Sequence, residues 1–462
     1  MDKELILREE KIPKALLKLS LPAIIGILIS AIYNVVDTLF VGMLNDTRAI
    51  GAIAISYPLF MMIAASGQMI GVGGGALISR YLGSDDKKHA NITLTFLLYL
   101  AIGLSVIMTI FGVLHLEWIL VSLGATPTIL PYAKTYTLLI MLGIFFTVIN
   151  MTLNNTIRAE GNSKYSMYAI GLGAVINIIL DPIFIFTLDY GIKGAAIATV
   201  IAQFISTIFL VRYYFSDASM LKFTFKGFKL KKSIIIAVLM MGLPSFSRQI
   251  LVSVSMAVYN NALEGYGDVA IAAGGISMRV VSIVMFTIFG FAQGFQPIVA
   301  YNYGRKNFER ILEAFKLSLI WVIIYSVFFN GLYMVFSETI IRIFSVDLEV
   351  IKLGQLNLYS LNIFFFTFGI TTIVTTLYQS IGKGRDSFIL ACSRNGFFFI
   401  PLVYILSHKF GLNGIIASNA VADLISGIFT VYYLQKIYKT LKKEVKNEKE
   451  EVTEKTSKLC SC

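Results

Sequence analysis

The chain has 462 residues, of which 56% are hydrophobic and 14% are charged, and its formal net charge is +12. This composition excludes a water-soluble protein, because a soluble surface needs more charged side chains. Uncharged stretches of roughly 20 residues or more recur along the whole chain, and each is long enough to cross a bilayer. The sequence therefore predicts a polytopic membrane protein.

Twelve membrane spans are predicted. We expect helices, because hydrocarbon cannot satisfy backbone polar groups and the segments lack the alternation of barrel strands. The fold class is thus all-α. The N-terminus mixes both charge signs and has no small-residue cleavage site, so the first span should stay in the mature protein. In chain order the spans lie near residues 16–41, 50–79, 90–114, 129–157, 164–187, 194–215, 233–263, 269–301, 309–335, 350–380, 387–407 and 412–434.

The basic residues predict the orientation. Thirty of the 39 Lys and Arg residues lie in the N-terminus, the middle loop, the tail and the loops after even-numbered spans, and six lie on the opposite side. The side with the excess is cytoplasmic, so both termini should face the cytoplasm of a multi-pass plasma-membrane protein. We attribute the positive charge to this topology and to contact with membrane lipids, and expect no nucleic-acid partner.

The chain repeats itself at an offset of about 221 residues. "SLP" at 20–22 recurs as "GLP" at 242–244, and "RYLG" at 80–83 corresponds to "YNYG" at 301–304. The offset also relates "AEGNS" at 159–163 to "SIGKG" at 380–384, and "YGIKG" at 190–194 to "FGLNG" at 410–414. Six spans in each half make the repeats parallel. The expected units are an N-lobe (1–215), a basic cytoplasmic linker (216–232), a C-lobe (233–434) and a charged cytoplasmic tail (435–462).

Two similar bundles that face each other leave a central cleft, the architecture of an alternating-access carrier. No nucleophile elbow, P-loop or paired-acid motif is present, so neither an enzyme nor a cofactor is expected. Cys392, Cys460 and Cys462 form no disulfide framework. We expect the chain to act as a monomer.

Ionisable side chains well inside the spans, away from the span ends, are rare and unevenly divided. Each costs at least about 2.5 kcal/mol at the bilayer centre, so each should face a partner, a cavity or water. The first half has two acids and no base, and the second half has three bases and one acid. These residues are Asp37 and Asp181, and Arg248, Arg279, Arg394 and Asp423.

The uncompensated acids of the first half predict a cation site. Asn177 precedes Asp181 by four residues, so both side chains lie on one helix face. Carboxylate, amide and hydroxyl oxygens suit a hard cation such as Na⁺, and a proton could equally bind one carboxylate. Pro182 lacks an N–H, which frees the carbonyl of Ile178 and marks a hinge in the helix.

Other polar residues of the first half fall on helix faces near these acids. Two roles are open for these residues: they bind the cation or the substrate, or they only hydrogen-bond membrane helices to one another. For the arginines of the second half, structural pairing with Asp423 competes with binding of an anionic substrate or a lipid headgroup. The first group comprises Tyr33, Asn34, Asn150, Asn154, Thr199 and Gln203.

The chain resembles the multidrug and toxic compound extrusion (MATE) transporters, in particular their MepA-like bacterial branch, over residues 10–435. The motifs that carry the resemblance are "SLPAIIGILISAIYNVVDTLFVG" in span 1, "GVGGGALISRYLG" in span 2, "NIILDPIFIF" in span 5 and "AYNYG" in span 8.

This resemblance implies export of amphipathic, often cationic compounds, driven by inward Na⁺ or H⁺. It implies a cation site at Asp37, Asn177, Asp181 and Thr199, and a substrate cavity. The residues expected to line that cavity are Tyr33, Asn34, Asn150, Asn154 and Gln203.

The second half departs from relatives that place acids in spans 7 and 10, so the resemblance gives it no cation site. Two rival functions remain: a flippase for lipid-linked sugars, which would use the basic residues, and a membrane sensor or scaffold, which would not need the polar constellation.

Overall fold

The structure, a computed structural model, describes residues 3–44, 46–225 and 231–460, with side chains as far as Glu450. These residues form helices and no β-strand, which confirms the all-α prediction. Residues 226–230 of the expected linker and 461–462 of the expected tail, including Cys462, lie outside the described residues.

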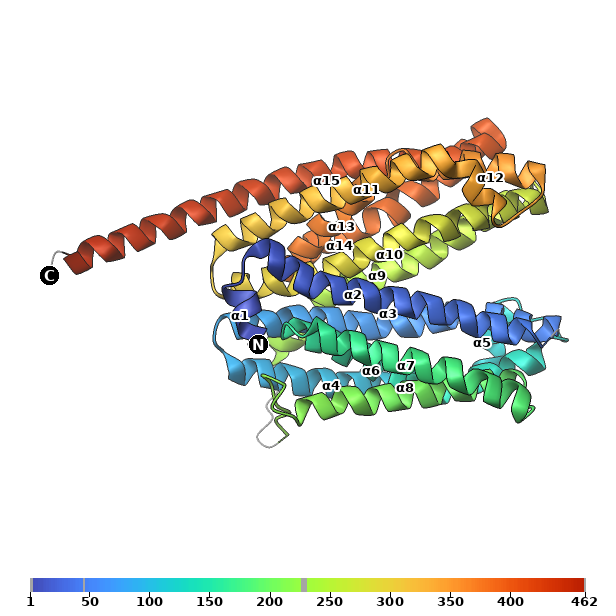
Figure 1. The fold of residues 1–462 in the computed structure, drawn as a ribbon, viewed down its shortest axis with the longest axis horizontal. Coiled ribbons are helices and arrows are strands. Elements are labelled where there is room, and N and C mark those ends of the chain that lie inside the picture. Colours follow the sequence, from blue (N-terminus) through green and yellow to red (C-terminus); the bar gives the residue numbers. More distant parts are fainter. Residues whose placement is uncertain (1–2, 45, 226–230, 461–462) are drawn as a thin grey trace.

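The first half of the chain forms eight α-helices and one π-helical turn, which lie together on one side of the molecule (Figure 1). α1 is a short helix at the end of the bundle where the chain begins, and α5 lies at the opposite end (Figure 1). The other helices match the first six predicted spans to within about five residues at their ends. The elements are α1 (Lys3–Arg8), α2 (Ile12–Gly42), α3 (Thr47–Gly83), α4 (Lys87–Leu114), α5 (Leu116–Ser122), α6 (Leu130–Ala159), α7 (Ser163–Pro182), η1 (Ile183–Thr187) and α8 (Ile192–Tyr214).

The second half lies beside the first and ends in a helix that protrudes from the bundle (Figure 1). Its elements are α9 (Lys232–Glu264), α10 (Asp268–Gly304), α11 (Phe308–Arg342), α12 (Leu348–Asn362), α13 (Phe365–Ser380), α14 (Gly384–Cys392), η2 (Ser393–Phe399) and α15 (Ile400–Cys460).

Ten helices of the described chain are long and apolar enough to span a membrane, and α12 with α13, bent by 42°, makes an eleventh span. The two spans predicted at 387–407 and 412–434 fall within one helical segment, Gly384–Glu450. That segment breaks at Gly411, where φ is 58° and ψ is −137°. A side chain rarely adopts this backbone conformation, so glycine permits the chain to reverse there.

The same turn occurs in the first half. Gly191, which precedes α8, has φ 51° and ψ −131°, nearly the values of Gly411. The two glycines occupy matching places in "YGIKG" and "FGLNG". The repeated motif therefore encodes the same change of direction before the last span of each half.

The two halves meet through a reciprocal contact between α3 and α10. A Cβ atom added to Gly83 would lie 1.9 Å from the carbonyl oxygen of Tyr301, and one added to Gly304 would lie 2.0 Å from that of Arg80. These residues are the repeated "RYLG" and "YNYG" motifs, so the repeats pack against each other. Only glycine allows backbones this close.

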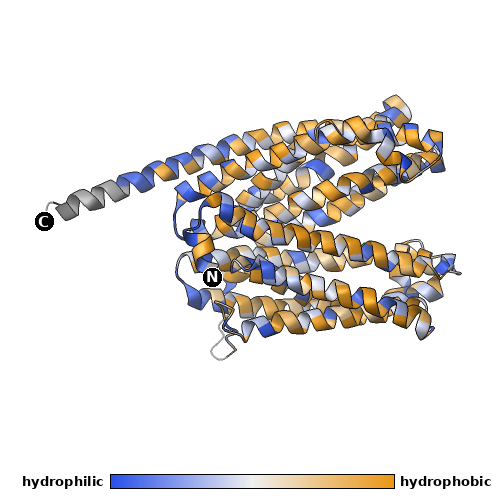
Figure 2. Ribbon diagram, in the orientation of Figure 1, coloured by the Kyte–Doolittle hydropathy of each residue, from blue (hydrophilic) through white to orange (hydrophobic). Residues whose placement is uncertain are grey.

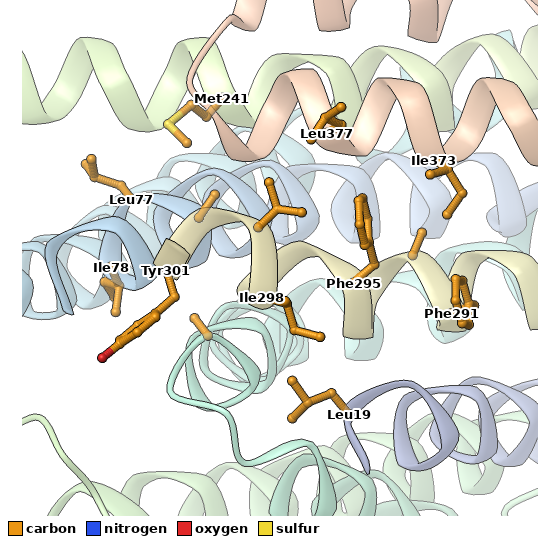
Figure 3. Close-up of a cluster of buried hydrophobic side chains, with 14 of the residues drawn as sticks. Leu19, Leu77, Ile78, Met241, Phe291, Phe295, Ile298, Tyr301, Ile373 and Leu377 are labelled. Carbon is orange, nitrogen blue, oxygen red and sulfur yellow. The ribbon is translucent and has the colours of Figure 1, made fainter. Parts of the chain in front are cut away.

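Buried apolar side chains from both halves fill the space around this contact (Figure 3). Phe295 and Ile298 of α10 are fully buried at its centre. Leu19 and Leu77 come from the first half, and Leu377 comes from the second. The core is therefore shared between the halves at this end of the molecule.

The beginning of the expected linker packs against the first half. Glu160, which is fully buried, accepts hydrogen bonds from Ser219 Oγ at 3.0 Å and from the backbone N–H of Met220 at 2.7 Å. The backbone N–H groups of Lys222 and Thr224 donate to side chains of α4, each at 2.9 Å. The first residues of the expected linker are thus held against the first half by these hydrogen bonds.

The hydropathy of the residues changes along the long axis of the bundle (Figure 2). Apolar residues cover its length, whereas hydrophilic residues gather at its ends and along the protruding part of α15. Large apolar side chains are exposed on its outer helices, including Ile107 and Ile428 at 65% each. Such exposure fits a protein surrounded by lipid.

Candidate functional site

The predicted cation-site residues come together between α2, α7 and α8. Asp181 is fully buried and Asn177 is 2% exposed. Asn177 Nδ2 donates to Asp181 Oδ1 at 3.1 Å and to Thr199 Oγ1 at 3.4 Å. The carboxyl group of Asp37 contacts that of Asp181. Four residues separated by up to 162 positions thus share one polar pocket.

This pocket contains acceptor oxygens that lack donors. Asp37 Oδ1, Asp181 Oδ2 and Asn177 Oδ1 are buried, and no described group donates a hydrogen bond to them. No basic side chain of the described chain interacts with either carboxylate. Buried acceptors of this kind are normally satisfied by a proton, a cation or water. The donor set fits a proton or Na⁺, whose preferred ligands are oxygens.

Tyrosine rings border the acids. Tyr33, one turn before Asp37 on α2, is close enough to interact electrostatically with both carboxylates. Tyr136 of α6 has the same relationship to Asp37 and Asp181. Tyr136 is not among the residues predicted for the site, although it lies on the same face of α6 as Asn150 and Asn154, about four and five turns before them. Only the approach of α6 to α2 and α7 places it at the site.

A change of helical geometry adjoins the acids. α7 ends at Pro182, and Ile183–Thr187 continue as a π-helical turn. Proline provides no N–H for the carbonyl of Ile178, and π-turns commonly occur at functional sites. Gly194 at the start of α8 packs against the backbone of Phe184, where an added Cβ would lie 2.6 Å away. The π-turn therefore fixes α8, and with it Thr199, against α7.

The expected substrate-contacting residues are only partly assembled. Asn150 Nδ2 donates to Gln203 Oε1 at 2.7 Å, which links α6 to α8 one turn from Thr199. Asn154 is 7% exposed, and its Oδ1 accepts from Ser166 Oγ at 2.8 Å on α7. These bonds join helices, and they leave Asn150 Oδ1 buried without a donor among the described residues.

Asn34 lies apart from the other expected residues. Its side chain is exposed, and Nδ2 donates to the carbonyl of Ser30 at 2.7 Å on its own helix. Tyr33 precedes it by one residue and faces the acids instead. The structure thus brings Tyr33, but not Asn34, to the polar pocket.

The second half contains no counterpart of the acid pair. At the offset of the repeats, Asp37 corresponds to Tyr259, and Thr199 corresponds to Asn419. The hydroxyl group of Tyr259 donates to Asn357 Oδ1, a neutral contact. Asp423, the one acid well inside the predicted spans of that half, is fully buried and paired with Arg394.

Comparison with known proteins gives a consistent result. The MatE family model matches the chain twice, at residues 22–183 and 244–405. The multidrug export protein MepA of Staphylococcus haemolyticus is 32% identical over 430 residues, which cover 92% of this chain and 95% of that protein. MepA of Staphylococcus aureus (strain NCTC 8325) is 30% identical over 435 residues, with the same coverage.

Solved structures show the same architecture. A structure described as the outward-facing conformation of a multidrug resistance MATE family transporter has a TM-score of 0.90, with 26% identity over 96% of this chain and 99% of the other. A Pyrococcus furiosus transporter of the MOP superfamily gives the same values, and its description reports a reverse polarity of the binding pocket. The chain therefore belongs to the MatE family of membrane transporters and is a transport protein rather than an enzyme.

Proposed function

We propose that the protein exports amphipathic, often cationic compounds from the cell in exchange for inward Na⁺ or H⁺. The observation that carries this proposal is the pair of carboxylates formed by half-buried Asp37 and fully buried Asp181, each of which has one buried oxygen without a donor and neither of which has a basic partner among the described residues. The relatives named as multidrug export proteins support the substrate class. Both termini would face the cytoplasm.

The structure suggests how ion and substrate are coupled. Helix α2 contacts the second half through Ser20 Oγ, which donates to the carbonyl of Phe291 at 3.1 Å. Nearly five turns later the same helix places Asp37 against Asp181 of α7. A cation bound between Asp37 and Asp181 would draw α2 toward α7. The same helix would then transmit this shift to the contact between the halves.

Cation and substrate would therefore oppose each other. A bound cation favours the arrangement in which the first half closes, and bound substrate favours the open one. Linkage is reciprocal, so substrate must weaken cation binding by the factor by which the cation weakens substrate binding. Such antagonism produces exchange without requiring both ligands at one site.

Dye export from reconstituted vesicles tests this proposal. A Na⁺ gradient and a pH gradient would be imposed separately, and accumulation of a cationic dye against its own gradient would be followed by fluorescence. Dye export that is driven by one of the two gradients and is lost in Asp181→Asn supports the proposal. Export that is indifferent to both gradients, or that survives in Asp181→Asn at the wild-type rate, would overturn it.

The alternative of a lipid-linked sugar flippase needs a basic cavity in the second half. Arg394 is not available to bind such a substrate, because its guanidinium group is paired with Asp423. Arg279 is exposed on α10. One partly buried arginine, Arg248, remains, and this is less than a pyrophosphate-linked substrate would require.

A further inference from the structure

The three arginines that lie well inside the spans of the second half have different surroundings. Arg394 makes a two-point ion pair with Asp423, and its NH1 group donates to Asn395 Oδ1 at 2.9 Å. Arg279 is exposed. Arg248 of α9 is partly buried, and no described carboxylate interacts with it. It is therefore an internal cation without a counter-charge.

Arg248 also has unused donors. Its guanidinium group lies over the ring of Phe289, with Cζ 4.7 Å from the ring centroid. The guanidinium group makes no hydrogen bond within the described chain, and each of its nitrogen atoms is at least partly exposed to solvent. An accessible guanidinium group with five free N–H donors is well suited to bind an anion.

The position of Arg248 in the membrane strengthens this point. It lies 16 residues from each end of α9 (Lys232–Glu264), or about 24 Å along the helix axis. This is the middle of the predicted span 233–263, where an arginine exposed to lipid is costly. The next residue, Gln249, contacts Met61 Sδ of α3 at 3.4 Å, so α9 meets the first half at this depth. Carriers hold their substrates at this depth, between their repeats.

Aromatic rings extend the site. Phe289 packs edge-on against Phe368, with centroids 5.5 Å apart, and Phe365 stacks on Phe368 at 5.3 Å. A planar ligand could continue this aromatic layer while an acidic group met Arg248. The opposite half offers the carboxylates of Asp37 and Asp181, so this acid pair and the guanidinium group of Arg248 come from different halves.

We propose that Arg248 is an anion subsite, which binds the carboxylate of planar aromatic substrates whose rings lie against Phe289. This inference rests on the proposed export function and extends it from cationic compounds to zwitterionic and anionic ones. Asp423 keeps Arg394 from competing for the same group. Arg248 would thus decide which acidic compounds the transporter accepts.

A matched pair of dyes provides the test: a rhodamine that carries a free carboxylic acid, and its methyl ester. Binding of each to purified protein in neutral detergent would be measured by fluorescence anisotropy. We expect Arg248→Gln to weaken binding of the acid by about tenfold or more, the strength of a charge-assisted hydrogen bond, and to change binding of the ester by less than about twofold. Arg279→Gln, which removes an exposed arginine, should change neither.

The control variant Arg248→Lys retains the charge without the planar fork, so it should fall between wild type and Arg248→Gln. Melting temperature and gel filtration would verify that each variant is folded. An equal loss of both dyes in folded Arg248→Gln, or no loss of the acid, would overturn the proposal.

Two further outcomes separate the alternatives. If phosphatidylglycerol added to the micelles abolishes the preference of the wild-type protein for the acid dye over the ester, Arg248 binds a lipid phosphate and the assignment to aromatic carboxylates is wrong. If vesicles export neither dye while purified protein still prefers the acid through Arg248, the export proposal fails and the anion subsite stands.

Discussion

Arg394 and Asp423 lie 29 residues apart in the sequence, yet their side chains form a two-point ion pair inside the second half. In one continuous helix these residues would be about 43 Å apart. The pair can form because the chain reverses at Gly411. It therefore locks two successive spans together and neutralises one of the three arginines.

Loss of this pair should affect folding more than transport. Asp423→Asn leaves Arg394 without its counter-charge, at a cost of about 3–5 kcal/mol. We expect a large fall in the yield of folded protein, measured by fluorescence-detected gel filtration. Asp386→Asn is the control, because Asp386 pairs with exposed Lys436 at 3.8 Å and such pairs contribute less than about 1 kcal/mol. A well-folded Asp423→Asn protein with altered ion dependence would contradict this prediction.

Removal of the carboxylate of Asp37 or of Asp181 should abolish coupled export. In Asp37→Asn and Asp181→Asn the site keeps its shape but loses a negative charge, so it can no longer bind the driving cation. Both variants should still reach the membrane, as measured by immunoblotting, while dye export from vesicles falls to background. The control Asp386→Asn should export normally, and pumping by either site variant at the wild-type rate would refute the assignment.

Pro182 should influence the rate of transport more than the affinity for substrate. Pro182→Ala restores an N–H that can bond to the carbonyl of Ile178, which would straighten the junction between α7 and the π-turn. We expect export to slow several-fold with nearly unchanged equilibrium binding of dye. Pro131→Ala, at the start of α6, is the control, because the first turn of a helix needs no N–H there. Parallel loss of rate and affinity would show that Pro182 shapes the binding site itself.

Glu160 should hold the start of the linker on the first half. Its carboxylate accepts hydrogen bonds from Ser219 and Met220, and bonds to a charged acceptor contribute about 2 kcal/mol each. Glu160→Gln should therefore increase tryptic cleavage after Lys222 several-fold in limited proteolysis. Glu264→Gln, an exposed acid at the opposite end of α9, serves as the control. Unchanged cleavage would show that the apolar contacts of the linker suffice.

The orientation can be tested with single cysteines in a background that lacks the native ones. Gly265→Cys, between α9 and α10, should react with a membrane-impermeant maleimide added to intact cells. Ser84→Cys, just after α3, and Lys446→Cys, in the last part of α15, should react only after the cells are opened. The reverse pattern would invert the predicted topology.

The sequence alone was sufficient for the fold class, the family and most of the spans. Hydropathy and net charge are local properties, so apolar stretches of sufficient length and the excess of lysine and arginine can be read without knowing any contact. The repeated motifs were equally visible, and the shared turn at Gly191 and Gly411 gives one of them a physical meaning. Asp37 and Asp181 attracted attention because acids are costly in hydrocarbon.

Tertiary structure decided which of the polar groups meet. Helical spacing placed Asn177 beside Asp181, but it could not bring Tyr136 to the site or turn Asn34 away from it. Nor could it tell Arg394, which pairs with Asp423, from Arg248, which pairs with no carboxylate of the described residues. Spacing fixes which residues share a face of one helix, whereas the packing of each face against other helices depends on contacts between residues far apart in the chain.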